Sequence, residues 1–167
     1  MEFFSVSVSI SVFILEVSMK IAVGSDEKTG LTDAVVADLS ERSHDLTLFG
    51  PLVEKDTYWP AVAQQVAEAV VNGDADEGIL FCWTGTGVSL AANKVPGIRA
   101  SLCDDAETAR GARLWNNANV LCLSIRRTSE VMAKEILDSW FDNAYVPNDV
   151  DDACMAQIAE IEEKYVK

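Results

Sequence analysis

The sequence predicts an α/β protein, a three-layer α/β/α sandwich around a five-stranded parallel sheet. Apolar runs of strand length alternate with longer amphipathic segments along the chain after Met19. The apolar runs are nearly continuous, which is typical of strands buried on both faces. Residues that favour turns, chiefly Gly, Pro, Asn and Asp, separate the segments. Each strand is therefore expected to be followed by a helix that returns the chain to the next parallel strand.

Five strands and six helices are expected within one domain, residues 19–167. The strands cover residues 20–24, 45–49, 78–82, 98–103 and 118–123. The first helix, 30–42, places Leu31, Val35 and Leu39 on one face, as a helix packed on a sheet requires. The other helices cover residues 60–72, 87–94, 105–116, 128–142 and 151–166.

Residues 1–18 differ from the rest of the chain. They contain an apolar stretch but no basic beginning, and Glu16 interrupts them, so they make a poor signal peptide. We expect a non-native or disordered extension that results from an upstream start codon. The alternative is an extra edge strand, because Ser-Val-Ser-Val-Ser-Ile alternates with the period of a strand.

Composition limits the classes of function. The 167 residues include 13 basic and 27 acidic side chains, a formal charge of −14, which argues against general nucleic-acid binding. No segment is long enough to span a membrane. The four cysteines lack CxxC spacing and there is one histidine, His44, so we expect a cytoplasmic protein without disulfides, metal or cofactor.

The segment 78–94 carries the clearest functional signal. An apolar strand ends on Cys82, a Gly/Thr-rich loop Trp83–Gly87 follows, and a helix begins there. Ligands of α/β proteins bind at the carboxyl ends of parallel strands, and backbone N–H groups of such loops attract anionic oxygens. A cysteine at a strand end is usually a core residue, but beside this loop Cys82 is a candidate general base.

Two further loops carry polar candidates with alternative roles. Asp26 and Glu27 could accept hydrogen bonds from sugar hydroxyls or could cap the helix 30–42. Arg126 and Arg127 could clamp a phosphate or carboxylate. Alternatively, one arginine covers the helix 128–142 while the other pairs with a surface acid.

The end of the helix 105–116 is the last candidate region. Trp115 could belong to the core, and Asn116 and Asn117 could cap the helix, or all three could reach a neighbouring loop.

Nucleotide binding is a further alternative. The loop Trp83–Gly87 lacks both the Walker GxxxxGK[ST] pattern and a full GxGxxG, so the sequence gives it little support.

Three segments resemble one known family. Lys20–Gly30 is similar to the first strand and Ser-Asp loop of the ribose-5-phosphate isomerase B and galactose-6-phosphate isomerase family. Gly78–Ala100 resembles the central motif of that family, and Asn116–Leu121 resembles its Asn-Asp-x-Asn-Val-Leu segment. The similarity covers residues 19–145, and the chain is identified as a divergent member.

The resemblance implies a Rossmann- or flavodoxin-like fold, and dimers or tetramers whose subunits share active sites. It also implies a metal-independent aldose–ketose isomerisation of a sugar or sugar phosphate, which passes through an enediolate. It makes Cys82 the base and Thr84 a residue that helps to open the sugar ring. The substrate-binding residues that we expect are Asp26, Glu27, Trp83, Gly85, Thr86, Gly87, Ser89, Trp115, Asn116 and Arg126.

Four departures from the family pattern predict a changed substrate. Glu27 replaces a histidine, Trp83 replaces a glycine at the pocket floor, and Trp115 replaces the histidine that opens the sugar ring. Carboxylates in 147–152 replace basic groups that bind phosphate, and they would repel a phosphate dianion.

We therefore expect an isomerase whose substrate differs from ribose 5-phosphate, with a short open-chain or unphosphorylated hydroxy-carbonyl compound as one possibility. The alternative is a non-catalytic or hetero-oligomeric sugar-binding subunit, completed by a paralogous partner. Ribose-5-phosphate isomerisation is a third possibility, because Arg126, Arg127 and Lys28 could rebuild the phosphate clamp.

Overall fold

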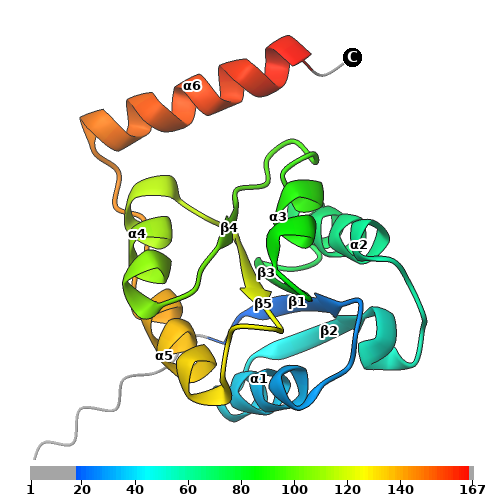
Figure 1. Cartoon of the computed structure of the whole chain (residues 1–167). Coiled ribbons are helices and arrows are strands. Elements are labelled where there is room, and N and C mark those ends of the chain that lie inside the picture. The colour runs from blue at the N-terminus through cyan, green and yellow to red at the C-terminus, as the bar shows by residue number, and fades with distance from the viewer. Residues whose placement is uncertain (1–17, 166–167) are drawn as a thin grey trace, which may run out of the picture.

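The computed structural model describes residues 18–165, and the predicted extension 1–18 lies outside this range except for Ser18. All five strands pair in parallel, in the order β2-β1-β3-β5-β4 (Figure 1). The strands are β1 (Lys20–Ser25), β2 (Asp45–Phe49), β3 (Glu77–Cys82), β4 (Ala100–Leu102) and β5 (Val120–Ser124). The predicted parallel sheet is confirmed.

Helices cover both faces of the sheet. They are α1 (Gly30–Glu41), α2 (Trp59–Val71), α3 (Thr86–Ala92), α4 (Ala106–Asn116), α5 (Glu130–Phe141) and α6 (Asp149–Tyr165), with a 3-10 turn η1 (Gly50–Val53). Side chains of α1, α4 and α5 form one apolar core with the sheet, and those of α2 and α3 form the other. Figure 1 shows α6 crossing above this body. No helix within residues 18–165 is both long and apolar enough to cross a membrane.

The edge strand β4 is shorter than the predicted strand 98–103 because side-chain amides replace part of its backbone pairing. The Arg99 N–H donates to Asn119 Oδ1 at 2.8 Å. The Asn93 side chain accepts from the Ala100 N–H and donates to the Ala100 carbonyl, each at 2.8 Å. Asn93 thus satisfies polar groups on the open edge of the sheet, where unpaired groups invite association.

A buried ion pair ties the amino edge of the sheet to α4 and α5. Arg113 Nη2 lies 2.5 Å from Glu77 Oε1, and the Trp140 indole N–H donates to Glu77 Oε2 at 2.5 Å. Arg113 also donates to the carbonyls of Ala118 and Asn143. Because both charges are desolvated and bonded on several sides, the network holds the ends of α4 and α5 in place.

Replacing Arg113 should leave the Glu77 carboxylate buried without its countercharge. We expect Arg113→Met to lower the free energy of unfolding by about 3–5 kcal/mol, measured by urea denaturation. Arg110, which pairs with Glu107 on the exposed side of the same helix, is the matched control, and Arg110→Met should cost less than about 1 kcal/mol. Equal losses in the two variants would contradict a stabilising role for the buried pair.

Candidate functional site

An open cleft lies at the carboxyl edge of the sheet, between the loops that follow β3, β4 and β5. Its volume is about 650 Å³. The lining residues are Thr84, Thr86, Leu102, Asp104, Ser124, Arg126 and Arg127. Three neighbouring parallel strands end there, so their following loops meet at one place, as ligand sites of open α/β sheets require.

Cys82 ends β3 at the base of this loop cluster. Its side chain is 5% exposed, and its carbonyl accepts from the N–H groups of Gly85 and Ile125 at 3.2 and 3.0 Å. Burial raises the pKa of the Cys103 thiol to about 12 and raises that of Cys122 as well, so these two thiols stay protonated. Cys154 is exposed on α6. The Cys82 side chain packs in the core between the sheet and the helices α2 and α3, and the chain reaches the cleft two residues later, at Thr84.

The loop after Cys82 is held open by a left-handed turn. Gly85 has φ +75° and precedes α3, and a Cβ at this position would lie 2.4 Å from Leu102 Cδ1. Thr84 Oγ1 and Thr86 Oγ1 are 2.7 Å apart and both line the cleft. No side chain caps α3, and since the Gly85 N–H donates to the Cys82 carbonyl, the N–H groups of Thr86 and Gly87 at the start of the helix are the ones that can meet an anionic oxygen.

Two tryptophans, Trp83 and Trp59, lie in segments next to the cleft. Trp83 is 56% exposed and is not among the residues that line the cleft, so its place at the pocket floor stays a prediction. The backbone carbonyl of Trp83 accepts hydrogen bonds from Ser124 Oγ and from the Arg126 N–H, each at 3.0 Å. Trp59 was not predicted as a site residue. Its indole packs 3.0 Å from where a Gly87 Cβ would lie, and its signal in the sequence is the Trp-Pro pair that begins α2 at this edge.

Asp26 follows β1 at the level of Cys82, since Ser25 pairs with Phe81 in the ladder. Its Oδ1 atom is buried without a hydrogen-bond partner, and burial raises the pKa of this carboxyl. Thr29 caps α1 through a capping box with Thr32, so the alternative that Asp26 or Glu27 caps the helix is wrong. The Asp26 side chain is therefore left available for a ligand, beside the exposed Glu27.

Trp115 and Asn116 lie away from Cys82 in the same chain. α4 runs back toward the amino edge, where the Gly78 N–H at the start of β3 donates to the Asn119 carbonyl. Both residues line a separate groove of about 500 Å³ beside β4. Trp115 is 54% exposed, so it is not a core residue, and its ring lies on Gly111.

The remaining expectations at the helix ends have mixed outcomes. Asn117, with φ 44°, is the C-cap of α4, whereas Asn116 is its last helical residue. Ser89 lies in α3 and does not line the cleft. Arg127 approaches Asp104 at 3.9 Å, which matches the expected pairing of one arginine with a surface acid.

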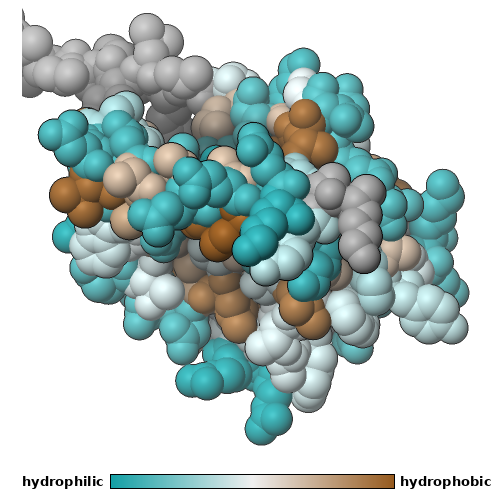
Figure 2. Space-filling view, turned by 90° about the horizontal axis from the view of Figure 1, so that it is seen from above, coloured by the Kyte–Doolittle hydropathy of each residue, from teal (hydrophilic) through white to brown (hydrophobic). Residues whose placement is uncertain are grey.

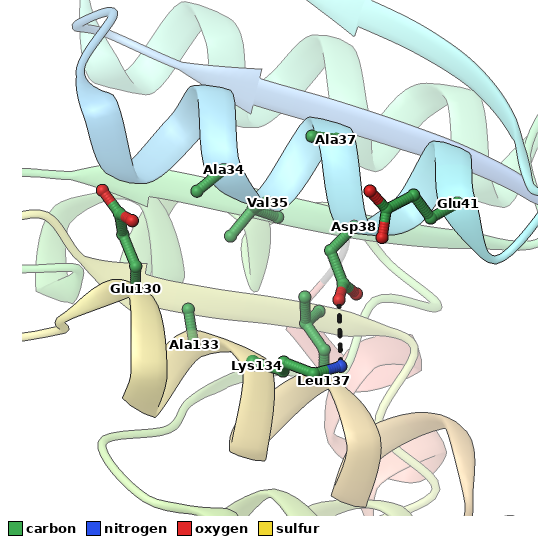
Figure 3. Close-up of a pocket in the computed structure, with 9 residues that line it drawn as sticks. All are labelled: Ala34, Val35, Ala37, Asp38, Glu41, Glu130, Ala133, Lys134 and Leu137. Atoms are coloured by element: carbon green, nitrogen blue, oxygen red, sulfur yellow. Dashed lines mark hydrogen bonds and ion pairs between the residues drawn. The ribbon is translucent and has the colours of Figure 1, made fainter.

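A third hollow, of about 210 Å³, lies between α1 and α5 (Figure 3). It exists because small residues face each other there, among them Ala34 and Ala133. Lys134 Nζ contacts Asp38 Oδ1 at 3.4 Å across this hollow. The candidate active site is the cleft at the carboxyl edge of the sheet, which the loop after Cys82 helps to line. Among residues 18–165, no three His, Cys, Asp or Glu side chains are grouped to hold a metal ion.

Comparison with known proteins agrees with this geometry. The family model described as Ribose/Galactose Isomerase matches residues 21–158. The chain belongs to this family. It is 41% identical over 127 residues to ribose-5-phosphate isomerase B of Escherichia coli, covering 75% of this chain and 85% of that protein.

Two further relatives of the family bear on the site. D-erythrulose-4-phosphate isomerase of Pectobacterium atrosepticum is 38% identical over 127 residues, covering 74% of this chain and 83% of that protein. The structure of Clostridium thermocellum ribose-5-phosphate isomerase B aligns with a TM-score of 0.84 and 38% identity, covering 89% of this chain and 100% of that one. Both of these relatives are named as sugar-phosphate isomerases.

Gly85 should be intolerant of any side chain. Gly85→Ala meets both the strain of a positive φ and the clash with Leu102, so we expect a loss of about 2–5 kcal/mol in urea unfolding. Gly73 is the matched control, since it has φ +78° but no atom within 4 Å of the point where a Cβ would lie. Gly73→Ala should lose only about 1–2 kcal/mol. If the two variants lost the same amount, crowding at the loop would be disproved.

Proposed function

We propose that the chain is an aldose–ketose isomerase in which Cys82 is the base that moves a proton between adjacent carbons of the substrate. The observation that carries the proposal is that Cys82 ends β3 directly before the Trp83–Gly87 loop, whose Thr84 and Thr86 line a cleft with two arginines. Its relatives are sugar-phosphate isomerases, and a thiol beside anion-stabilising N–H groups suits their reaction.

The chemistry follows from the positions of these groups. The Cys82 thiolate removes the proton from the carbon beside the carbonyl, and the resulting enediolate carries negative charge on its oxygens. The N–H groups of the loop stabilise that charge. The Cys82 thiol then returns the proton to the neighbouring carbon while a hydroxyl proton passes between the two oxygens. The buried Oδ1 of Asp26 accepts a hydrogen bond from a substrate hydroxyl.

The substrate that we propose is a short, open-chain sugar phosphate. Trp115 stands where the family resemblance places the histidine that opens a sugar ring, and an indole cannot transfer that proton. A four-carbon ketose with a phosphorylated terminal hydroxyl cannot close a ring and needs no such histidine. The Pectobacterium relative, named for D-erythrulose 4-phosphate, supports this choice.

Proton exchange with solvent tests this function directly. In deuterated water, the protein should catalyse exchange at the carbon beside the carbonyl of D-erythrulose 4-phosphate, followed by NMR, faster than with ribose 5-phosphate. Cys82→Ala should reduce the rate about 10³-fold, while Cys154→Ser, which removes an exposed thiol, should leave it unchanged. Absence of exchange with every aldose and ketose phosphate would reject the proposal.

We further infer that the active form is a dimer with shared sites. Trp115 and Asn116 line the groove of about 500 Å³ beside β4, away from Cys82. Helix α6 has no buried side chain, although it carries the apolar residues Ile161 and Tyr165, which are exposed. Figure 2 looks down on this region and shows hydrophobic side chains interspersed among hydrophilic ones. A second copy that covers this surface would bring its Asn116 to the first copy's cleft.

Mixing two inactive variants tests the shared site. If one chain supplies Cys82 and the other Asn116, re-formed mixtures of Cys82→Ala and Asn116→Ala should recover about a quarter of wild-type activity, because half of the dimers carry one intact site. No recovery in a confirmed mixed dimer would contradict sharing. Activity that appears only with a paralogous chain would instead support the hetero-oligomeric alternative.

A further inference from the structure

Thr84 and Thr86 carry two hydroxyls in the cleft to which the proposed chemistry gives no role. Their Oγ1 atoms lie 2.7 Å apart, a normal O–H···O distance, and either can be the donor. Both residues line the cleft, and within residues 18–165 neither hydroxyl has another hydrogen-bond partner. Ring opening, the role that the family resemblance gives Thr84, is not needed by a substrate that cannot close a ring. The pair is therefore available for another step.

The backbone holds these two threonines in place. Gly85 lies between them with φ +75°, and a Cβ there would lie 2.4 Å from Leu102 Cδ1 and 3.1 Å from the carbonyl carbon of Leu123. The Gly85 N–H also donates to the Cys82 carbonyl at 3.2 Å. Because the turn is both packed and hydrogen-bonded, it presents the two hydroxyls from fixed positions, directly after the strand that ends on Cys82.

One proton transfer in the proposed isomerisation has no residue assigned to it. After the thiolate has removed a proton from C1 of the ketose, O1 still carries its proton and O2 carries the negative charge. A direct transfer between these neighbouring oxygens would bend the O–H···O angle far from linear, and hydrogen bonds weaken steeply below about 120°. Cys82 cannot perform this transfer while it holds the proton taken from carbon. The step therefore needs other groups.

We propose that Thr84 and Thr86 are catalytic residues that relay this proton from O1 to O2. One hydroxyl accepts the O1 proton and passes its own proton to the second hydroxyl, which protonates O2, so each threonine gains one proton and loses one. The electron pair left on O1 re-forms the carbonyl at C1 as the Cys82 thiol protonates C2. The relay runs in both directions because either threonine oxygen can be the donor. This inference rests on the proposed function and deepens it.

The spacing of the pair suits the relay. The two oxygens of a cis-enediolate sit on neighbouring carbons of a planar double bond, which holds them about one hydrogen-bond length apart. Two hydroxyls 2.7 Å apart can face them side by side, so that each transfer follows a nearly straight hydrogen bond. Threonine is branched at Cβ, which restricts χ1 and keeps the hydroxyl in a defined direction.

Isomer formation and carbon exchange, measured together, test the relay. In deuterated water with D-erythrulose 4-phosphate, Thr86→Val should slow formation of the aldose about 10- to 100-fold, because it removes one hydroxyl at nearly constant volume. Deuterium incorporation at C1 of the recovered ketose should stay within about twofold of wild type, since Cys82 performs it. Thr86→Ser, which keeps the hydroxyl, should restore aldose formation. Thr47→Val, which removes an exposed hydroxyl from β2, is the matched control and should change neither rate.

A double variant completes the test. If the two hydroxyls act as one relay, Thr84→Val combined with Thr86→Val should be no more than about threefold slower than the slower single variant. Losses that multiply, or an equal fall of exchange and isomerisation in Thr86→Val, would overturn the relay but not the role of Cys82. Absence of exchange in the wild-type protein would instead reject the proposed function, and the relay with it.

Discussion

The site depends on the register of the parallel ladder around β3. Ser25 of β1 pairs with Phe81, and Cys82 pairs with Ser124 of β5, so three strand ends lie at one level. A shift of one residue in β3 would turn the Cys82 side chain to the other face of the sheet. The thiol, the Asp26 carboxyl and the arginine turn after Ser124 therefore share their position because the backbone hydrogen bonds fix it.

Two glycines, Gly24 and Gly78, allow helix α2 to approach the strands β1 and β3 closely. A Cβ at Gly24 would lie 2.7 Å from Val62 Cγ2, and one at Gly78 would lie 2.7 Å from Val66 Cγ1. Because these two positions lack side chains, α2 packs directly on β1 and β3. The beginning of α2 then brings Trp59 against Gly87, so packing within this core determines how closely α2 approaches the start of α3.

Local charge and overall charge act in opposite directions in this protein. The chain as a whole repels anions, yet the cleft combines backbone N–H groups with two arginines whose positions follow from one short turn. Such an arrangement favours an anion that fits the cleft over anions in general, because the attraction acts only at short range.

The sequence by itself determined the layered fold, the strand that ends on Cys82 and the loop beside it, because periodicity and turn residues are local signals. Only the tertiary structure decided which side chains meet. It assigned the cap of α1 to Thr29, turned Trp83 outward, left Trp115 in a groove away from Cys82 and brought Trp59 to the loop. These outcomes depend on helix direction and on packing between segments far apart in the chain, which no local pattern encodes.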